Sequence, residues 1–151
     1  MAQINTREVC LLQQTTATTT GTAADIVLPQ GYTAAIVTLA VNTTSGTTPT
    51  LNVYVQDRLR QAASTDLSGA DVANTATPLY DDLIAFAQAT TSGNQVARLV
   101  GGGNVVAAQK DAALTAGSVA SGPIGATWRV KYVLGGTTPS FSFNVVCQFI
   151  P

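Results

Sequence analysis

The sequence contains no histidine, and this absence removes several kinds of active site. Histidine is the side chain whose ordinary pKa lies closest to neutral pH, and it is the commonest general base and a frequent zinc ligand. Catalysis by a Ser-His-Asp or a Cys-His arrangement is therefore excluded for this chain. A glycosidase-like reaction would need paired carboxylates, and the only adjacent pair is Asp81-Asp82.

We interpret Asp81 and Asp82 as two solvated residues that introduce a strand. A calcium site is the alternative, because Ca²⁺ binds about six to eight oxygen ligands and Asp57, Asp66 and Asp71 precede the pair in a segment of unknown path. The rest of an EF-hand pattern is missing. We therefore expect no metal ion, no cofactor and no enzymatic activity.

Charged residues are also scarce, at 10% of the chain against a usual share of about 25%. The net charge is −1, and the seven basic residues are scattered along the sequence. Because no basic stripe could neutralise a row of phosphates, nucleic acid is not an expected partner. Hydroxyl and amide groups are cheaper to desolvate than Lys and Glu, which favours a protein that functions in contact with other proteins.

Long apolar runs are missing as well. None reaches the roughly 18 residues that a membrane span requires, and the first residues, Met1 to Glu8, are polar. We therefore expect no membrane partner and no signal peptide, and we expect synthesis in a cytosol.

Only two cysteines occur, Cys10 and Cys147, near opposite ends of the sequence. We interpret both as buried thiols that act as small hydrophobic residues. A disulfide that joins the first strand to the last is the alternative.

Short segments of alternating apolar and polar residues dominate what is present, and this period is typical of half-buried β-strands. The 151 residues fit a single domain, 1–151. About eight strands are predicted, at residues 8–13, 26–28, 35–41, 51–56, 83–88, 95–100, 128–134 and 141–149.

A Gly-Thr-Thr-Pro motif occurs twice, at 46–49 and at 136–139, each time between two alternating segments. We interpret each copy as the turn of a β-hairpin, and segments 83–88 and 95–100 as a third hairpin. No amphipathic helix is convincing. The pattern predicts an all-β fold, a two-layer antiparallel β-sandwich that is jelly-roll-like, because the Cys-Trp-Cys spacing of immunoglobulin domains is absent. The strand order stays open.

Two segments, 57–78 and 104–125, have no clear periodicity and are predicted to be long loops. Loops longer than about 12–15 residues are uncommon in compact domains unless they are functional or disordered. Together with an N-terminal arm, residues 1–7, they are the segments expected to bind a partner.

Four residues are candidates for partner binding. Arg58 and Arg60 are two positions apart, so they would project from one strand face beside Tyr54. A solvated edge is the favoured interpretation, and contact with the carboxylates of a partner or of a neighbouring subunit is the alternative. Arg7, in the N-terminal arm, is the fourth candidate.

The strand sequences Ser-Gly-Thr-Thr-Pro-Thr-Leu-Asn-Val-Tyr-Val-Gln and Trp-Arg-Val-Lys-Tyr-Val-Leu-Gly-Gly-Thr-Thr-Pro-Ser-Phe-Ser-Phe carry a resemblance to a known class of protein. With the middle hairpin, they resemble small β-sandwich structural proteins of tailed bacteriophages, and above all the capsid decoration or cement proteins. The resemblance covers roughly residues 33–56, 83–100 and 126–149. It does not cover the two long loops.

This resemblance implies a virion protein on the capsid surface, made in the host cytoplasm, that stabilises the shell without catalysis. Its partners would be the major capsid protein and further copies of itself, as a homotrimer. The alternative is a phage tail or fibre adhesion module that binds host surface glycans. Tyr54, Trp128 and Tyr132 would then be the residues that stack on sugar rings.

Overall fold

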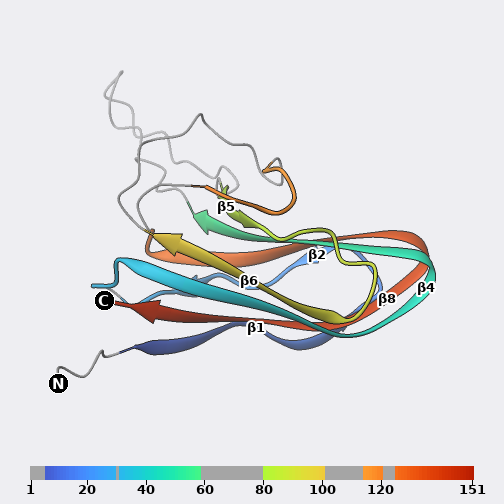
Figure 1. Ribbon diagram of the computed structural model, residues 1–151, viewed down its shortest axis with the longest axis horizontal. Coiled ribbons are helices and arrows are strands. Elements are labelled where there is room, and N and C mark those ends of the chain that lie inside the picture. Colours follow the sequence, from blue (N-terminus) through green and yellow to red (C-terminus); the bar gives the residue numbers. More distant parts are fainter. Residues whose placement is uncertain (1–5, 30, 59–79, 101–113, 121–124) are drawn as a thin grey trace, which may run out of the picture.

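The computed structural model describes residues 6–29, 31–58, 80–100, 114–120 and 125–151, and every regular element among them is a β-strand (Figure 1). All strand pairs are antiparallel, which confirms the all-β antiparallel prediction. The strands are β1 (Arg7–Ala17), β2 (Gly21–Thr22), β3 (Ile26–Val27), β4 (Ala34–Arg58), β5 (Tyr80–Ala85), β6 (Gly93–Val100), β7 (Ser118–Val119) and β8 (Thr127–Ile150). The described residues contain no helix that could cross a membrane.

The two long strands, β4 and β8, form the centre of one hydrogen-bonded sheet with the order β1-β8-β4-β5-β7. They pair from Ala34 opposite Ile150 to Asp57 opposite Trp128, almost their whole length. The short strands β2 and β3 pair with β8, and β6 pairs with β4. Every other described strand except β7 therefore forms backbone hydrogen bonds with β4 or β8.

Both long strands bend at the Gly-Thr-Thr-Pro motif, and the two motifs meet there. Thr47 pairs with Thr137, and backbone φ is +116° at Gly46 and +100° at Gly136. The third residue of each copy, Thr48 or Thr138, also has positive φ, 47° and 48° respectively. We call this bend, residues 46–49 and 136–139, the corner.

The corner divides the sheet into two parts that run one above the other in Figure 1, with the corner on the right. The first half-sheet holds β1, β6, residues 34–45 of β4 and residues 140–150 of β8. The second holds β2, β3, β5, β7, residues 50–58 of β4 and residues 127–135 of β8. The described strands thus form one sheet that folds over on itself, an arrangement consistent with the predicted sandwich-like fold.

The prediction of hairpins at the two motifs is therefore wrong. Residues 34–45 and 50–58 belong to one strand, and their hydrogen-bonding partner on one side is β8 throughout. The positive φ values bend the chain while the ladder to the other motif continues, so the segments before and after a motif lie in different half-sheets. The third hairpin is wrong too, because β5 pairs with residues 54–58 of β4 and β6 with residues 34–41.

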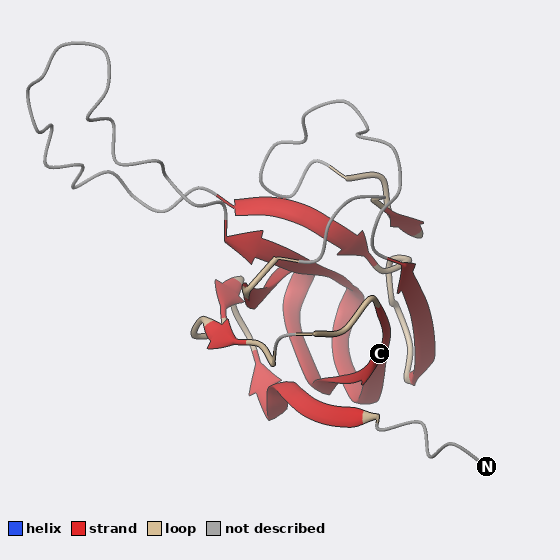
Figure 2. Ribbon diagram, turned by 90° about the vertical axis from the view of Figure 1, so that its left-hand side faces the viewer, coloured by secondary structure: helices blue, strands red, loops and turns tan. Residues whose placement is uncertain are grey.

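The predicted apolar faces form the core. Val37, Leu39, Leu51 and Val53 are fully buried, as is the face of β8 that was predicted to be the most regular: Phe141, Phe143, Val145, Cys147 and Phe149. Seen from the end opposite the corner, strands of both half-sheets curve around this shared interior (Figure 2). Trp128 of the second half-sheet packs against Phe149 of the first, with 5.5 Å between ring centroids. The core therefore joins the two half-sheets.

The cysteines differ from expectation in one respect. Both are free, which excludes the alternative of a disulfide in this structure, but only Cys147 is buried, and Cys10 is exposed. Val9, the neighbour of Cys10, pairs with Cys147, so the two thiols lie on opposite faces of adjacent strands. Burial raises the pKa of Cys147 to about 12.

Most of the two predicted long loops and of the N-terminal arm lies outside the described residues. Where these segments are described, strands extend into them. Asp57 and Arg58 end β4, Arg7 begins β1, and Ser118–Val119 forms β7, which pairs with Ile84 and Ala85.

The corner generates a prediction about stability. A methyl group added at Gly46 would lie 2.6 Å from the carbonyl oxygen of Thr138, and one at Gly136 would lie 2.5 Å from that of Thr48. We expect Gly46→Ala and Gly136→Ala each to lower the free energy of unfolding by about 2–4 kcal/mol, measured by chemical denaturation. The double variant should lose less free energy of unfolding than the two single variants lose together, because both substitutions disturb the same corner.

Gly31→Ala is the matched control. Gly31 also has positive φ, at 90°, but an added methyl group there meets nothing within 4 Å. Its loss should be about 1 kcal/mol, the cost of the backbone conformation alone. Equal losses for all three variants would show that the corner is not tightly packed.

Candidate partner-binding site

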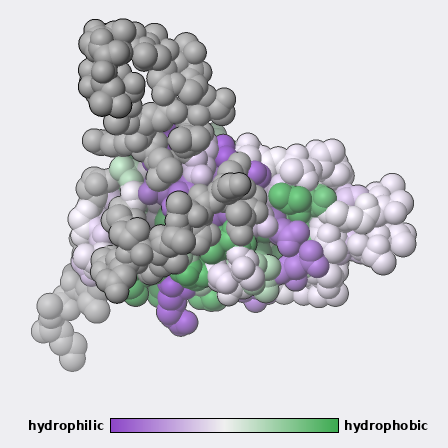
Figure 3. Space-filling model, turned by 90° about the horizontal axis from the view of Figure 1, so that it is seen from above, coloured by the Kyte–Doolittle hydropathy of each residue, from purple (hydrophilic) through white to green (hydrophobic). Residues whose placement is uncertain are grey.

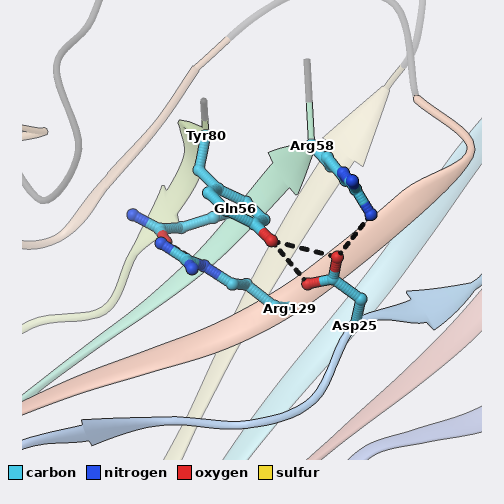
Figure 4. Close-up of polar contacts among 5 residues, drawn as sticks. All are labelled: Asp25, Gln56, Arg58, Tyr80 and Arg129. Atoms are coloured by element: carbon cyan, nitrogen blue, oxygen red, sulfur yellow. Dashed lines mark hydrogen bonds and ion pairs between the residues drawn. The ribbon is translucent and has the colours of Figure 1, made fainter. Parts of the chain in front are cut away.

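The outward face of the second half-sheet carries a network of polar side chains, and Figure 4 draws five of them. At its centre is Gln56 of β4, which is fully buried although it points away from the core. Gln56 Nε2 donates a hydrogen bond to Asp82 Oδ1 at 2.7 Å, and its Oε1 accepts one from Arg129 Nε at 2.8 Å. Asp82 Oδ2 accepts a further bond from the backbone N–H of Leu114, at 3.0 Å. Four separate segments of the chain are joined in this way.

The network continues toward solvent through an aromatic ring. The guanidinium of Arg129 lies over the ring of Tyr80, 3.2 Å from its centroid, in a cation–π contact. The Tyr80 hydroxyl donates to the carboxylate of Asp25, with 2.9 and 3.0 Å to the two oxygens. Arg58 Nη1 forms an ion pair with Asp25 Oδ2 at 3.2 Å. Desolvation raises the pKa of Tyr80, and the hydrogen bond to Asp25 adds to this shift.

Among the described residues, the members of this network bond one another. Its two arginines and two aspartates balance in charge, and each bonds another member. Within the described ranges, no three His, Cys, Asp or Glu side chains come together as a metal site would require. The interpretation of Asp81-Asp82 as a solvated pair is wrong, because Asp82 is fully buried in the network and Asp81 is half-buried.

A second group of polar side chains lies near the ends of the same strands that are farthest from the corner. Trp128, Asp57 and Asp81 stand opposite one another on β8, β4 and β5, on the face that points into the core. Among the described residues, each holds a buried atom without a hydrogen-bond partner: Trp128 Nε1, Asp57 Oδ1 and Asp81 Oδ1. Desolvation raises the pKa of Asp57 from 3.8 to about 6, nearby backbone N–H groups oppose this shift, and the charge of Asp81 adds to it.

The structure brings two of the four candidate residues together. Tyr54 and Arg58 share the outward face of β4, as predicted, with Tyr54 half-buried and the Arg58 side chain 48% exposed. Arg7 lies on β1 in the other half-sheet, opposite Phe149. Arg60 lies outside the described residues.

Sequence reasoning missed the residues that hold Arg58 in place. Asp25 and Tyr80 are far from Arg58 in sequence, and nothing in their local pattern marked them. One signal was available: Gln56 alternates with Tyr54 and Arg58 on the same strand face.

The residues proposed to stack on sugar rings are not presented to solvent as a group. Trp128 is fully buried against Phe149, and Tyr132 is half-buried with its ring edge-to-face on Phe143, at 5.4 Å. Only Tyr54 lies on an outward face. This arrangement offers no aromatic platform for a glycan.

No protein-family model, no curated protein and no solved structure matches this chain. The described residues therefore define it through its fold alone, as an antiparallel all-β protein whose single sheet is folded at one corner.

The position of Gln56 between Asp82 and Arg129 predicts that it matters for stability. Gln56→Leu removes an acceptor from Arg129 and a donor from the buried Asp82, so we expect the free energy of unfolding to fall by about 2–3 kcal/mol. Gln88→Leu is the control, because Gln88 makes a single exposed hydrogen bond, to Asn52. The assignment fails if the two variants lose equal stability in urea denaturation.

The raised pKa of Asp57 predicts a pH dependence. Because the folded-state pKa, about 6, exceeds the unfolded value of 3.8, the protonated form favours folding, and this contribution is lost as pH rises from about 4 to above 6. In Asp57→Asn the side chain stays neutral. Its free energy of unfolding relative to the wild type should therefore increase by about 1 kcal/mol between pH 4 and 7, after allowance for solvent screening.

The measurement is chemical denaturation of both proteins at several pH values. Gln88→Leu is the control, because it changes no titratable group, and its difference from the wild type should stay constant. A constant difference for Asp57→Asn as well would contradict the assignment.

Proposed function

We propose that this chain is a structural virion protein that binds and stabilises the capsid shell of a tailed phage as a decoration protein, without catalysis. The observation that carries the proposal is the uncharged corner. No charged side chain occurs from Ala34 to Gln56 or from Tyr132 to Pro151. The end of the molecule that holds the corner is accordingly almost white in Figure 3, neither strongly hydrophilic nor strongly hydrophobic.

The corner has the properties of a docking surface for protein. Most residues of 42–48, and all of 136–138, are exposed Thr, Ser, Asn and Gly. Their hydroxyl and amide groups lose water at lower cost than charges do. The close approach of the two motifs at Gly46 and Gly136 fixes the backbone, so little conformational entropy remains to be lost on binding. The corner is therefore the part of the described chain that we propose contacts the shell.

The rest of the described structure supports a role without chemistry. Among the described residues, the hydrogen bonds and the ion pair of the network around Gln56 join strands of the sheet to one another, which is what a structural network does. The resemblance of the strand sequences to capsid decoration proteins points in the same direction. The alternative, a tail or fibre module that binds glycans, has less support because Trp128 is buried in the core.

Binding to shells tests the proposal. Shells assembled from the major capsid protein of the phage that encodes this chain, without decoration protein, are mixed with the purified chain and sedimented. We expect the wild type to co-sediment, and the corner variant Thr47→Lys/Thr137→Lys to bind about tenfold more weakly, because two charges would have to be desolvated.

Thr22→Lys is the matched control, since Thr22 is an exposed residue of β2, away from the corner. It should bind like the wild type. Failure of the wild type to bind shells would overturn the proposed function, whereas equal binding of all three proteins would overturn the role of the corner. Trp fluorescence that responds to a host polysaccharide would favour the glycan-binding alternative.

A further inference from the structure

The outward face of the first half-sheet carries many apolar side chains. No other described segment covers this face. Its four strands lie in the order β1-β8-β4-β6, and the side chains that alternate with the core face point outward. Val96 and Val100 of β6 are 54% and 68% exposed. The apolar side chains on this face include Cys10, Ala34, Ile36, Val96, Val146 and Ile150 besides Val100.

Two charges stand at opposite edges of this face, in the same row. Glu8 of β1 is opposite Gln148 of β8, Gln148 is opposite Ile36 of β4, and Ile36 is opposite Arg98 of β6. Glu8 and Arg98 are both exposed, and neither has an ion-pair partner among the described residues. With strands about 4.8 Å apart, the two charges lie roughly 14 Å from each other, symmetrically about the line between β8 and β4.

We propose that two copies of this chain pack face to face through this surface, about a twofold axis that runs along the strands between β8 and β4. That axis places Glu8 of each copy over Arg98 of the other, so both ion pairs form at once. It also places Cys10 of each copy over Val96 of the other, so an apolar contact forms in the row next to the two ion pairs. An axis across the strands that passes through this row would instead set Glu8 against Glu8 and Arg98 against Arg98, which like-charge repulsion disfavours.

The geometry of sheet packing allows these contacts. Face-to-face sheets lie about 10 Å apart and rotate by about 30° relative to each other. At roughly 7 Å from the axis, this rotation displaces facing residues by about 3–4 Å, which the long side chains of Glu8 and Arg98 can span.

The free edge of β6 is a less favourable place for a second copy to bind than the face of the sheet. Residues 95–98 of β6 line a cavity of about 320 Å³ with residues 84–87 and 117–119, so this edge turns toward β5 and β7 of its own chain. Gln95 Nε2 crosses to the backbone oxygen of Ala87, at 2.8 Å. A strand added from another copy would have to displace this bond.

The size of the face sets the expected affinity. Four strands and four rows of outward residues cover about 400 Å² per copy in projection, and the total accessible area buried would be about 1,000 Å². This is the lower end for specific interfaces. The dimer should therefore form in a concentration-dependent manner, with a dissociation constant in the micromolar range. The inference is independent of the shell-binding proposal, and it differs from the homotrimer that the resemblance implies.

Sedimentation equilibrium of the full chain over a range of concentrations tests this dimer. We expect a mass that rises from 15.4 kDa toward twice that value. Arg98→Glu and Glu8→Arg each place like charges against one another across the axis and should weaken the dimer by at least about tenfold. The double variant Glu8→Arg/Arg98→Glu restores opposite charges and should restore the dimer.

Arg7→Glu is the matched control, because Arg7 is exposed and adjacent to Glu8 but lies on the other side of β1, so the dimer should be unaffected. A second measurement uses Cys10, the exposed thiol, whose alkylation should slow as the dimer forms while the buried Cys147 stays unreactive. A monomer at all concentrations, a trimer, or single variants that dimerise like the wild type would overturn the inference. A monomer whose Arg98→Glu variant fails to bind shells would assign the face to the shell instead.

Discussion

The antiparallel ladder between β4 and β8 is the constraint on which every other described strand depends. Strands β1, β2 and β3 pair with β8, strands β5 and β6 pair with β4, and β7 joins through β5. Because the two long strands remain paired through the corner, a single ladder supplies the central strands of both half-sheets. The glycines at 46 and 136 make this possible, since each approaches the backbone of the other motif too closely for a side chain.

The same ladder separates the polar surface of the molecule into two regions. Its corner end is uncharged, whereas Asp57, Arg58 and Arg129 lie at its other end, where the half-sheets are no longer joined by the backbone. There the network around Gln56 ties β4, β5 and β8 together by side chains. One end of the fold is thus fixed by close backbone packing, and the other by hydrogen bonds and ion pairs.

The sequence predicted the faces of the strands but not their partners. Alternation is a local property, so the buried faces that contain Val37, Leu51 and Phe143 could be identified without knowledge of the fold. A hairpin turn and a bend within a long paired strand have the same local pattern, and only the meeting of Thr47 with Thr137 distinguishes them. The buried network could not be predicted for a similar reason, since Gln56 is covered by residues that come from distant segments.

The pairing of β4 with β8 also determines how the chain acquires its fold. Ala34 pairs with Ile150, which is far away in the sequence, and few contacts of the sheet join residues that are close in sequence. Such a topology folds slowly, because a long loop must close before the ladder contributes any stability. On the ribosome, β1 and β4 are made early but lack their central partner until β8 has emerged. The apolar face of β4 therefore stays exposed to aggregation until β8 has emerged.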